Sequence, residues 1–404
     1  MTGCPLGIDI PGFLRFLREG DAASALERIK QQNPFPAICG RICPAPCEKA
    51  CIFDAEGSAI AIRSLERYAS DNGGKSKSKV AITLNGKKIA IVGSGPSAMA
   101  AASVLLRAGF KVTIFEAANE PGGILRYGIP EFRLPQDVIN EQFDELRLLG
   151  LEIQTNILIG RMKSLAELTA SFDAVLLATG ASLPDFALIE GENLPGVYYA
   201  EEFLMRAHIL SKDRIAGSLS QLLRGHQTLV VGSGYAALDA ARIAVRLGQE
   251  TSLVFGGLEE EMGIPENDLK EALEEGIKIH TPFEPMKIVV NQEGSSCGGV
   301  QCRRLEIVEG QDKLSLEVAK EEPVVLEAQT IILANSQKAN PFLAKATPHL
   351  KVKADGTLWV NETTSLTSLE KVFAQGAVVK GAMNVVEALA TGKAVAYQIM
   401  EHLK

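Results

Sequence analysis

The sequence predicts an α/β protein with two parallel-sheet units, preceded by a small helical domain rich in cysteine. Short β-branched runs alternate with Ala-rich helical stretches, which predicts parallel sheets joined by crossover helices. A G-x-G-x-x-A pattern occurs twice in this context, as GSGPSA at residues 93–98 and GSGYAA at 232–237. Of the seven cysteines, five lie within the first 51 residues, so we expect a separate amino-terminal domain.

The composition excludes several classes of protein. With 404 residues, 46% of them hydrophobic, the chain is long enough for two or three cores. A net charge of −8 gives no basic surface for nucleic acid, and no apolar run approaches the roughly 18–20 residues of a membrane helix. The first residues carry no secretory signal pattern. We therefore expect a cytoplasmic protein, whose cysteines bind metal rather than form disulfides.

The amino-terminal cysteines have a regular spacing. Cys39, Cys43, Cys47 and Cys51 follow one another every four residues. Proline after Cys43 and glycine after Cys39 turn the backbone between the thiols, which suits an iron–sulfur cluster. Structural zinc prefers C-x2-C pairs, which are absent here, so zinc and plain buried thiols are the alternatives. Ahead of the cysteines, residues 10–29 predict two short amphipathic helices.

The elements then follow in order along the chain. A polar, glycine-rich stretch at 72–79 is expected to link the helical domain to the first α/β unit. In that unit we expect strands at 88–92, 111–116 and 174–178, and helices at 98–108 and 135–149. In the second unit we expect strands at 228–231 and 250–255, and helices at 237–247 and 268–275. A β-rich stretch follows at 287–330, in which Cys297 and Cys302 are structural, and the chain ends with a strand, a glycine turn and a helix over 371–403.

Each glycine pattern follows a predicted strand and opens a predicted helix. In this context the glycines permit a tight turn, and the amides at the start of the helix bind a pyrophosphate. After the first pattern, Glu116 ends the next apolar run, where an acid binds the adenosine ribose. Two such units in one chain indicate a flavin that exchanges electrons with a nicotinamide.

Longer motifs carry a family resemblance. CGRICPAPCEKAC at 39–51 and IRSLERY at 62–68 resemble the amino-terminal cluster domain of the glutamate synthase small subunit. The same domain opens dihydropyrimidine dehydrogenase and the large subunit of ferredoxin:NADP transhydrogenases. Four further stretches are similar to this family: EPGGILRYGIPEFRLP at 120–135, LATGA at 177–181, GENLPGVY at 191–198 and VFAQGAVVKG at 372–381.

The resemblance implies two nested Rossmann-like domains of the glutathione-reductase type behind a helical iron–sulfur domain. The domains that it implies are 1–75 for iron–sulfur, 86–205 plus 326–404 for FAD, and 206–325 for an inserted NAD(P) domain. It places the FAD contacts at Gly93, Gly95, Pro96, Ser97, Ala98, Glu116, Gly122, Gly123, Leu125, Arg133, Ala178, Thr179, Gly180, Gly376, Ala377, Asn384 and Val385. The helix that begins near Asn384 would direct its amides at the flavin ring.

The resemblance also implies a ligand set for the cluster. The inner-cluster ligands that it assigns are Cys4, Cys43, Cys47 and the carboxylate of Glu66. It assigns Cys51 to an outer cluster, whose other ligands come from a segment that normally precedes this part of the family's sequence. We therefore expect one [4Fe-4S] cluster, with Cys51 or Cys39 as alternative fourth ligands. The regular spacing alone would instead select the four cysteines from Cys39 to Cys51.

The nicotinamide site departs from the family pattern. The resemblance places its contacts at Gly232, Gly234, Tyr235, Ala237 and Phe255. After this strand the family has two arginines for the 2′-phosphate of NADPH, whereas this chain has Gly256 and Gly257. Hydrogen bonds to charged groups contribute roughly 1.5–3 kcal/mol each, so their loss lowers NADPH affinity by about two to four decades. Tyr235 replaces an Asn of the family, and its ring is expected to crowd the turn. We expect NADH rather than NADPH, or a degenerate site.

The carboxy-terminal flavin motif also departs, because Ala377 stands where the family has an Asp that contacts FAD. The loss of one hydrogen bond weakens FAD binding without abolishing it.

None of the five histidines adjoins a cofactor motif, so no catalytic side chain is expected. Hydride transfer depends instead on how the nicotinamide and the flavin are oriented.

Three functional hypotheses follow. The first is an oxidoreductase subunit that moves electrons between a nicotinamide, FAD and one cluster, and on to other redox subunits of a complex. The second is a relay or docking subunit that holds FAD and the cluster but has a degenerate nicotinamide site. The third is a stand-alone flavin or disulfide reductase, against which the absence of a redox C-x-x-C near either glycine pattern argues.

Overall fold

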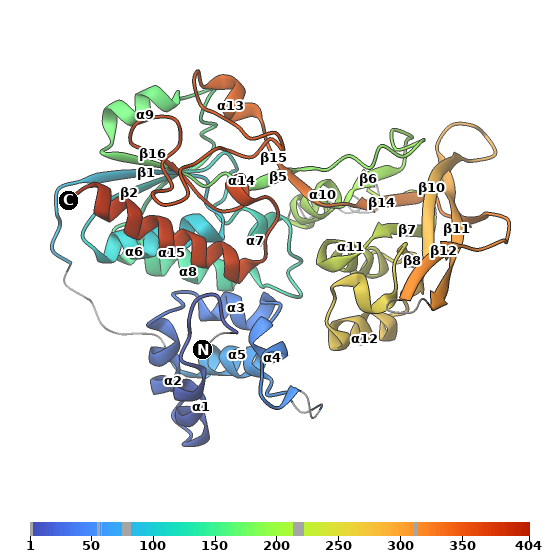
Figure 1. The fold of residues 1–404 in the computed structure, drawn as a ribbon, viewed down its shortest axis with the longest axis horizontal. Helices are drawn as coiled ribbons and strands as arrows, with labels where there is room; N and C mark the ends of the chain where they lie inside the picture. Colours follow the sequence, from blue (N-terminus) through green and yellow to red (C-terminus); the bar gives the residue numbers. More distant parts are fainter. Residues whose placement is uncertain (1–2, 55–56, 58, 75–81, 213–221, 310–313) are drawn as a thin grey trace. The chain divides into compact units, whose positions relative to one another are not determined.

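The computed structural model describes residues 3–54, 57, 59–74, 82–212, 222–309 and 314–404 (Figure 1). The chain forms two compact units, of which the first joins residues 1–126, 131–183 and 337–404, and the second joins 127–130 and 184–336. From residue 75 onward, the expected linker at 72–79 lies outside the described residues. Among the described helices, none combines the length and the apolar character that a membrane span requires.

The amino-terminal domain, part of the first unit, is helical. Its helices are α1 (Ile10–Arg18), α2 (Ala22–Lys30), α3 (Pro36–Ile42), α4 (Pro46–Lys49) and α5 (Ile62–Asn72). The side chains of Asp9 and Asp21 cap the first two helices, because each accepts a hydrogen bond from a backbone amide three residues on. Helix α3 packs closely on α5 at Gly40, where a Cβ would lie 2.6 Å from the backbone of Arg67.

The rest of the first unit is built on a five-stranded parallel sheet in the order β16-β4-β1-β2-β3. Its strands are β1 (Lys88–Val92), β2 (Lys111–Phe115), β3 (Glu152–Gln154), β4 (Ala174–Leu177) and β16 (Val372–Ala374). In Figure 1, helices α6 (Pro96–Arg107), α8 (Gln136–Leu148) and α15 (Val385–His402) lie on one side, and α9 (Leu165–Ser171) and α13 (Phe342–Ala346) lie on the other. The expected strands and helices of this unit are confirmed to within two residues at each end.

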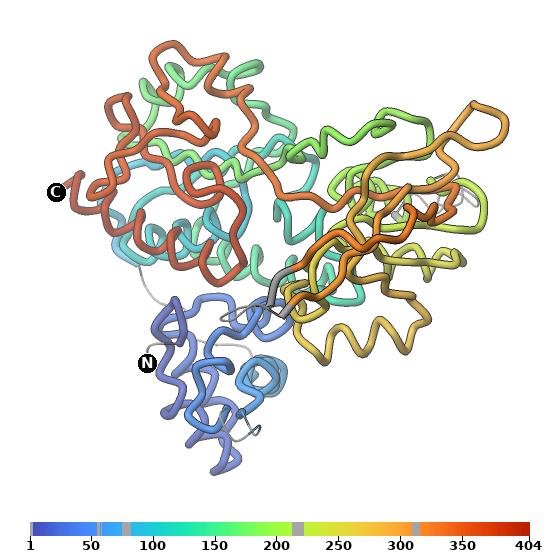
Figure 2. The backbone as a smooth tube through the Cα atoms, turned by 45° about the vertical axis from the view of Figure 1, so that its right-hand side comes forward, coloured from blue at the N-terminus to red at the C-terminus, as the bar shows by residue number. Residues whose placement is uncertain are grey.

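The amino-terminal helices contact the sheet domain through α2 and α3. Lys30 at the end of α2 forms an ion pair with Glu145 of α8, with Nζ 3.3 Å from Oε2. Lys393 of α15 donates a hydrogen bond to Gln32 Oε1 over 3.1 Å. Figure 2 shows the amino-terminal helices, in blue, next to α15, in red. The carboxy-terminal helix therefore packs against the amino-terminal domain.

The second unit repeats the parallel sheet in the order β6-β14-β7-β8-β9. Its strands are β6 (Val197–Tyr199), β7 (Gln227–Gly232), β8 (Glu250–Val254), β9 (Lys278–His280) and β14 (Thr330–Ala334). The helices α10 (Ala200–Lys212), α11 (Gly234–Arg246) and α12 (Glu266–Glu274) belong to this unit. The predicted β-rich stretch contains β10 (Phe283–Val290), β11 (Cys297–Glu309), β12 (Leu314–Val318) and β13 (Val324–Glu327).

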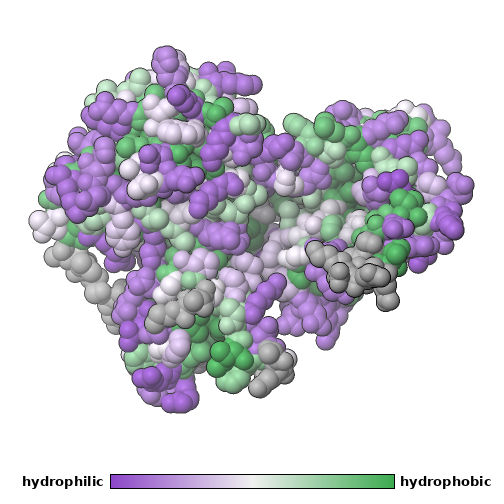
Figure 3. Space-filling view, viewed as in Figure 1, coloured by the Kyte–Doolittle hydropathy of each residue, from purple (hydrophilic) through white to green (hydrophobic). Residues whose placement is uncertain are grey.

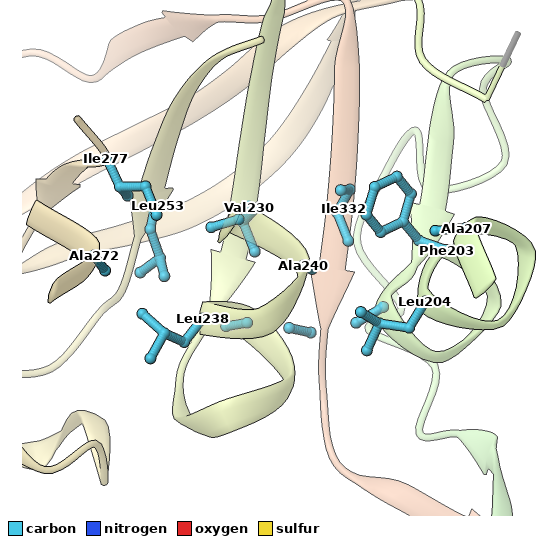
Figure 4. Close-up of a cluster of buried hydrophobic side chains, with 14 of the residues drawn as sticks. Phe203, Leu204, Ala207, Val230, Leu238, Ala240, Leu253, Ala272, Ile277 and Ile332 are labelled. Carbon is cyan, nitrogen blue, oxygen red and sulfur yellow. The ribbon is translucent and has the colours of Figure 1, made fainter. Parts of the chain in front are cut away.

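The second unit is wider than the 206–325 that we expected for the inserted domain. Strands β6 and β14 both pair with its sheet, and β14 lies between β6 and β7. Figure 4 shows the core that this sheet shares with its helices, in which Val230, Leu253 and Ile332 of the strands face Leu238 of α11 and Phe203 of α10. The inner strands of this sheet are therefore held by packing that joins residues far apart in the sequence.

Candidate functional site

The first glycine pattern forms a tight turn between β1 and α6. Gly93 has a φ of +99°, and a Cβ at this position would lie 2.4 Å from the carbonyl oxygen of Ala178. Only glycine fits there, because the turn passes directly over the end of β4. Gly95 caps α6, and Pro96 is its first residue. A Cβ on Gly123 would lie 3.1 Å from Gly95 Cα, so the second flavin motif reaches the same turn.

Ser94, between the two glycines, connects three predicted parts of the site. Its hydroxyl donates a hydrogen bond to Glu116 Oε2 and accepts one from Gly122 N over 2.8 Å. Glu116 Oε1 also accepts from Ala118 N over 2.8 Å. The acid at the end of β2 is thus held in place by the turn itself. We did not predict Ser94, although its position inside the glycine pattern is a usable signal.

Arg126 is a second residue that the sequence analysis missed. It is 2% exposed, and its guanidinium donates to Pro121 O, Gln136 Oε1 and Asn140 Oδ1 over 2.6–2.7 Å. These bonds attach the loop of the second flavin motif to α8. Arg133, which we did predict, is half-buried in the turn that precedes α8.

The carboxy-terminal motif meets α6 from the other side. Gly376 has a φ of +81°, and a Cβ there would lie 3.0 Å from Ser97 Cβ. Ser97 Oγ is buried, and no hydrogen bond to a described residue engages it. Ala377 opens the short helix α14 (Ala377–Lys380). A buried hydroxyl without a partner beside glycine turns fits a site that a polar ligand completes.

The remaining predicted FAD residues cluster around the same strand ends. Ala98 and Leu125 are buried, and Ala178, Thr179 and Gly180 follow β4 directly. Asn384 caps α15 through a capping box with Glu387, and Val385 is the first residue of that helix.

The second glycine pattern has the same backbone geometry. Gly232 ends β7 with a φ of +132°, and a Cβ there would lie 2.4 Å from Ala334 O. Gly234, with a φ of +73°, opens α11, in which Ala237 is fully buried. The hydroxyl of Tyr235 donates to Asp268 Oδ2 of α12 over 2.7 Å, so its ring is directed to that helix.

The end of β8 presents acids and open space. Phe255 packs against the helical core of the unit, and a Cβ on Gly257 would lie 2.6 Å from its ring. A Cβ on Gly256 would meet no atom closer than 3.6 Å. Beyond them, Glu259 and Glu260 are exposed, and no Lys or Arg occurs between residues 255 and 269. The segment that follows this strand therefore supplies no cation of its own to a 2′-phosphate.

A pocket in the amino-terminal domain collects the predicted cluster ligands. Five donor residues line it: Cys4, Cys39, Cys43, Cys47 and Glu66. The pocket residues do not include Cys51, which lies in the turn after α4. Cys47 lies in α4, which ends at Lys49, so the spacing of four does not continue along one helix face to Cys51.

Burial in this pocket disfavours negative charge on its donors. Burial raises the pKa of Glu66 to about 7, although a hydrogen bond from Asn33 lowers it. Burial also raises the pKa of Cys43 and of Cys47 to about 12, and that of Cys39 well above its usual range. Anionic ligands in such a site need nearby positive charge, which iron supplies.

No three His, Cys, Asp or Glu side chains among the described residues converge on one point, as a single ion would require. The donors instead surround a pocket, as the ligands of a four-iron cluster do.

The cluster pocket and the flavin motifs meet at the start of α15. Val386 lines the pocket together with the cysteines. It directly follows Asn384 and Val385, the two residues of this helix that we expect at the flavin. Val386 and Asn33, which also lines the pocket, are further residues that the sequence analysis missed. Only the turn signal of the Asn33-Pro34 dipeptide marks Asn33 in the sequence.

Comparison with known proteins covers the whole chain. The family described as pyridine nucleotide-disulphide oxidoreductase matches residues 87–392. The family described as dihydropyrimidine dehydrogenase domain II, 4Fe-4S cluster, matches residues 1–78.

Two curated relatives span nearly all of the chain. The glutamate synthase [NADPH] small chain of Escherichia coli is 30% identical over 99% of this chain and 88% of its own length. The NADP(+)-dependent formate dehydrogenase subunit beta of Moorella thermoacetica is 31% identical over 99% of this chain. The chain spans only 59% of that relative's length. Among solved structures, Mycobacterium tuberculosis FprA in complex with NADPH has a TM-score of 0.63 at 20% identity, over 78% of this chain and 85% of its own. That likeness shows the fold.

Proposed function

Because the chain belongs to the pyridine nucleotide-disulphide oxidoreductase family and carries a dihydropyrimidine dehydrogenase-type 4Fe-4S domain, we propose a specific electron path. Electrons pass between NADH, FAD and one [4Fe-4S] cluster, and on to a partner subunit. The observation that carries this proposal is the position of Val386, which lines the cluster pocket two residues after Asn384. Because a helix rises about 1.5 Å per residue, the flavin end of α15 and the cluster pocket are close neighbours.

The residues around the first sheet fit FAD. The turn at Gly93 and Gly95 offers the amides of α6 to the pyrophosphate, and Glu116 is oriented by Ser94 for the ribose. Ser97 Oγ is available to a phosphate or ribityl oxygen. When bound, the flavin supplies the conversion between two-electron hydride transfer and one-electron transfer to a cluster.

For the cluster we propose Cys4, Cys43, Cys47 and Glu66 as ligands. Glu66 is favoured over Cys39 on electrostatic grounds. A buried neutral thiol behaves as a small apolar group and costs little. A buried carboxylate that, among the described residues, accepts a hydrogen bond only from a neutral amide gains much more from an iron.

We propose NADH as the nicotinamide. The strand end at Gly256 lacks the arginines that hold a 2′-phosphate, and Glu259 and Glu260 follow it. A phosphate dianion near these carboxylates is repelled, whereas a ribose hydroxyl is not. The FprA structure was determined with NADPH. The glutamate synthase and formate dehydrogenase relatives likewise have names that specify NADP cofactors, so this chain would differ from them.

The partner that we propose is another redox subunit. The names of the two relatives describe a small chain and a subunit beta. Ile52 and Phe53, which follow Cys51, are 83% and 43% exposed, and Figure 3 shows apolar surface on the amino-terminal domain. A contact there would place a partner near the cluster. None of the seven cysteines forms a disulfide, which fits the reducing cytoplasm that we propose as the location.

The direct test is reduction of the purified protein under anaerobic conditions. We expect one FAD and about four irons per chain, and bleaching of the flavin by NADH at least ten times faster than by NADPH. If neither nucleotide reduces the flavin in the assembled complex, the electron-relay alternative replaces this proposal. An iron-free protein would overturn the cluster.

Single serine variants test the ligand set. Cys43→Ser should lose most of the iron, whereas Cys51→Ser should keep it, because Cys51 lies outside the pocket. Iron loss in Cys51→Ser with full retention in Cys43→Ser would contradict the assignment. The flavin content of both variants controls for folding of the first unit.

A further inference from the structure

Asn33 is a fully buried amide in the cluster pocket. Its Nδ2 donates a hydrogen bond to Glu66 Oε1 over 2.7 Å. Its Oδ1 accepts from Phe35 N over 2.9 Å, and its backbone amide donates to Ile29 O over 2.9 Å. The bond from the Phe35 amide fixes which end of the side chain is the oxygen, so the NH₂ group must face the pocket.

The amide makes the two oxygens of Glu66 inequivalent. Oε1 is occupied by Asn33, while no hydrogen bond or ion pair to a described residue engages Oε2. A carboxylate held in this way has one oxygen left to offer to an iron, so it binds through that oxygen alone. The hydrogen bond also restricts rotation of the side chain, which lies on α5, far in the sequence from the cysteines.

The fifth donor of the pocket is Cys39, which lines it together with Asn33 and Glu66. Cys39 is 1% exposed and lies in α3, one helical turn before Cys43. The pocket therefore holds five donors for four irons, and the Asn33 amide hydrogen-bonds one of the two candidates for the last position, Glu66.

We propose that Asn33 is a positioning residue that selects Glu66 over Cys39 as the fourth ligand of the cluster. This inference rests on the cluster and ligand set of the proposed function. Asn33 holds Glu66 through Oε1 and leaves Oε2 to bind an iron, so that Cys39 stays a thiol. When the amide is removed, an Fe–S bond to Cys39 replaces the Fe–O bond, and the thiol proton passes to the released carboxyl group.

The test uses Asn33→Ser, whose hydroxyl can still accept from Phe35 N but is too short to reach Glu66. In the anaerobically purified full chain, we expect iron content as in the wild type, a changed EPR spectrum of the reduced cluster, and a more negative midpoint potential. Thiolate is a softer and stronger donor to iron than carboxylate, which is the reason for that direction. Gln31→Ser, at an exposed neighbouring position, is the matched control and should leave both readouts unchanged.

The double variant Asn33→Ser/Cys39→Ser distinguishes a change of ligand to Cys39 from a general disturbance of the cluster pocket. The new EPR signal should disappear in it, while Cys39→Ser alone should keep the wild-type spectrum. A wild-type spectrum and potential in Asn33→Ser would overturn the proposal, as would a shift that persists without Cys39. If Asn33→Ser does not fold, Asn33→Leu, which preserves the volume, is judged by the same criteria. An iron-free wild type would instead overturn the proposed function itself, so the two failures are distinguishable.

Discussion

The hydroxyl of Tyr235 donates a hydrogen bond to Asp268 Oδ2 over 2.7 Å, which ties the second glycine turn to α12. Tyr235 is the first residue after Gly234, and Asp268 lies in the first turn of its helix. The helix that receives the pyrophosphate in this fold is therefore braced by a neighbouring helix. Tyr235 thus has a structural role in the second unit.

We expect Tyr235→Phe to lower the free energy of unfolding of the second unit by about 1–2 kcal/mol, because a hydrogen bond to a charged acceptor is lost. Denaturant unfolding followed by circular dichroism measures this effect. Tyr397→Phe, at a tyrosine that is 57% exposed, is the control and should change little. Equal stability of the Tyr235→Phe variant and the wild type would show that the bond contributes nothing.

Gly256→Arg should increase the preference for NADPH. A Cβ at this position has no neighbour closer than 3.6 Å, so the side chain has room to extend. One charge-assisted hydrogen bond is worth about 1.5–3 kcal/mol, so the NADPH-to-NADH ratio of kcat/KM should rise about 10- to 100-fold. Gly256→Gln supplies a long side chain without charge and should leave the ratio near its wild-type value. If Gly256→Arg changed kcat/KM for NADPH and for NADH by a similar factor, this would contradict a role in recognising the 2′-phosphate.

Ala377→Asp should tighten FAD binding. Ala377 opens α14 directly after Gly376, whose backbone lies against Ser97. A carboxylate there would accept a hydrogen bond from the cofactor, and a gain of about 1.4 kcal/mol corresponds to a tenfold lower Kd. Reconstitution of the apoprotein, followed by flavin fluorescence, gives this constant. Ala377→Leu is the control for side-chain size, and an unchanged Kd in the Asp variant would argue against contact with FAD.

The stability of the second unit should fall in acid through Glu275. Hydrogen bonds from Arg246 and Arg242 hold the pKa of Glu275 at about 2, below its ordinary value of 4.5. The contribution of this carboxylate is therefore complete above about pH 4.5 and is lost as the pH falls toward 2. At pH 7, Glu275→Gln should cost about 1 kcal/mol, because solvent partly screens these charges.

The measurement for Glu275 is urea unfolding of wild type and variant across this pH range. The difference in the free energy of unfolding between wild type and variant should shrink as the pH approaches 2. Glu274→Gln, at the exposed neighbouring position, is the control. A difference that stays constant with pH would mean that the ion pairs do not stabilise the fold.

Much of the fold could be predicted because its signals are local. The alternation of strands and helices, the two glycine turns and the start of α15 at Asn384 all depend on residues near one another in the chain. The domain boundaries were less predictable. Strands β6 and β14 have only three and five residues, and they are strands because they pair with each other and with β7.

The cluster ligands too were predictable from the sequence only in part. The sequence alone treats Cys39 and Cys51 alike, because both continue the spacing of four. The structure separates them because Cys39 lies in α3, which lines the pocket, whereas α4 ends at Lys49 and leaves Cys51 outside the pocket. Spacing predicts a common face only while the helix is continuous.

The sequence by itself determined the two glycine turns, the cysteine-rich domain and the family, because each depends on residues that are adjacent in the chain. Only the tertiary structure decided which donors share a pocket, that Asn33 hydrogen-bonds Glu66, and that Val386 joins this pocket to the flavin end of α15. These contacts come from helix packing, which brings together side chains that no local pattern relates.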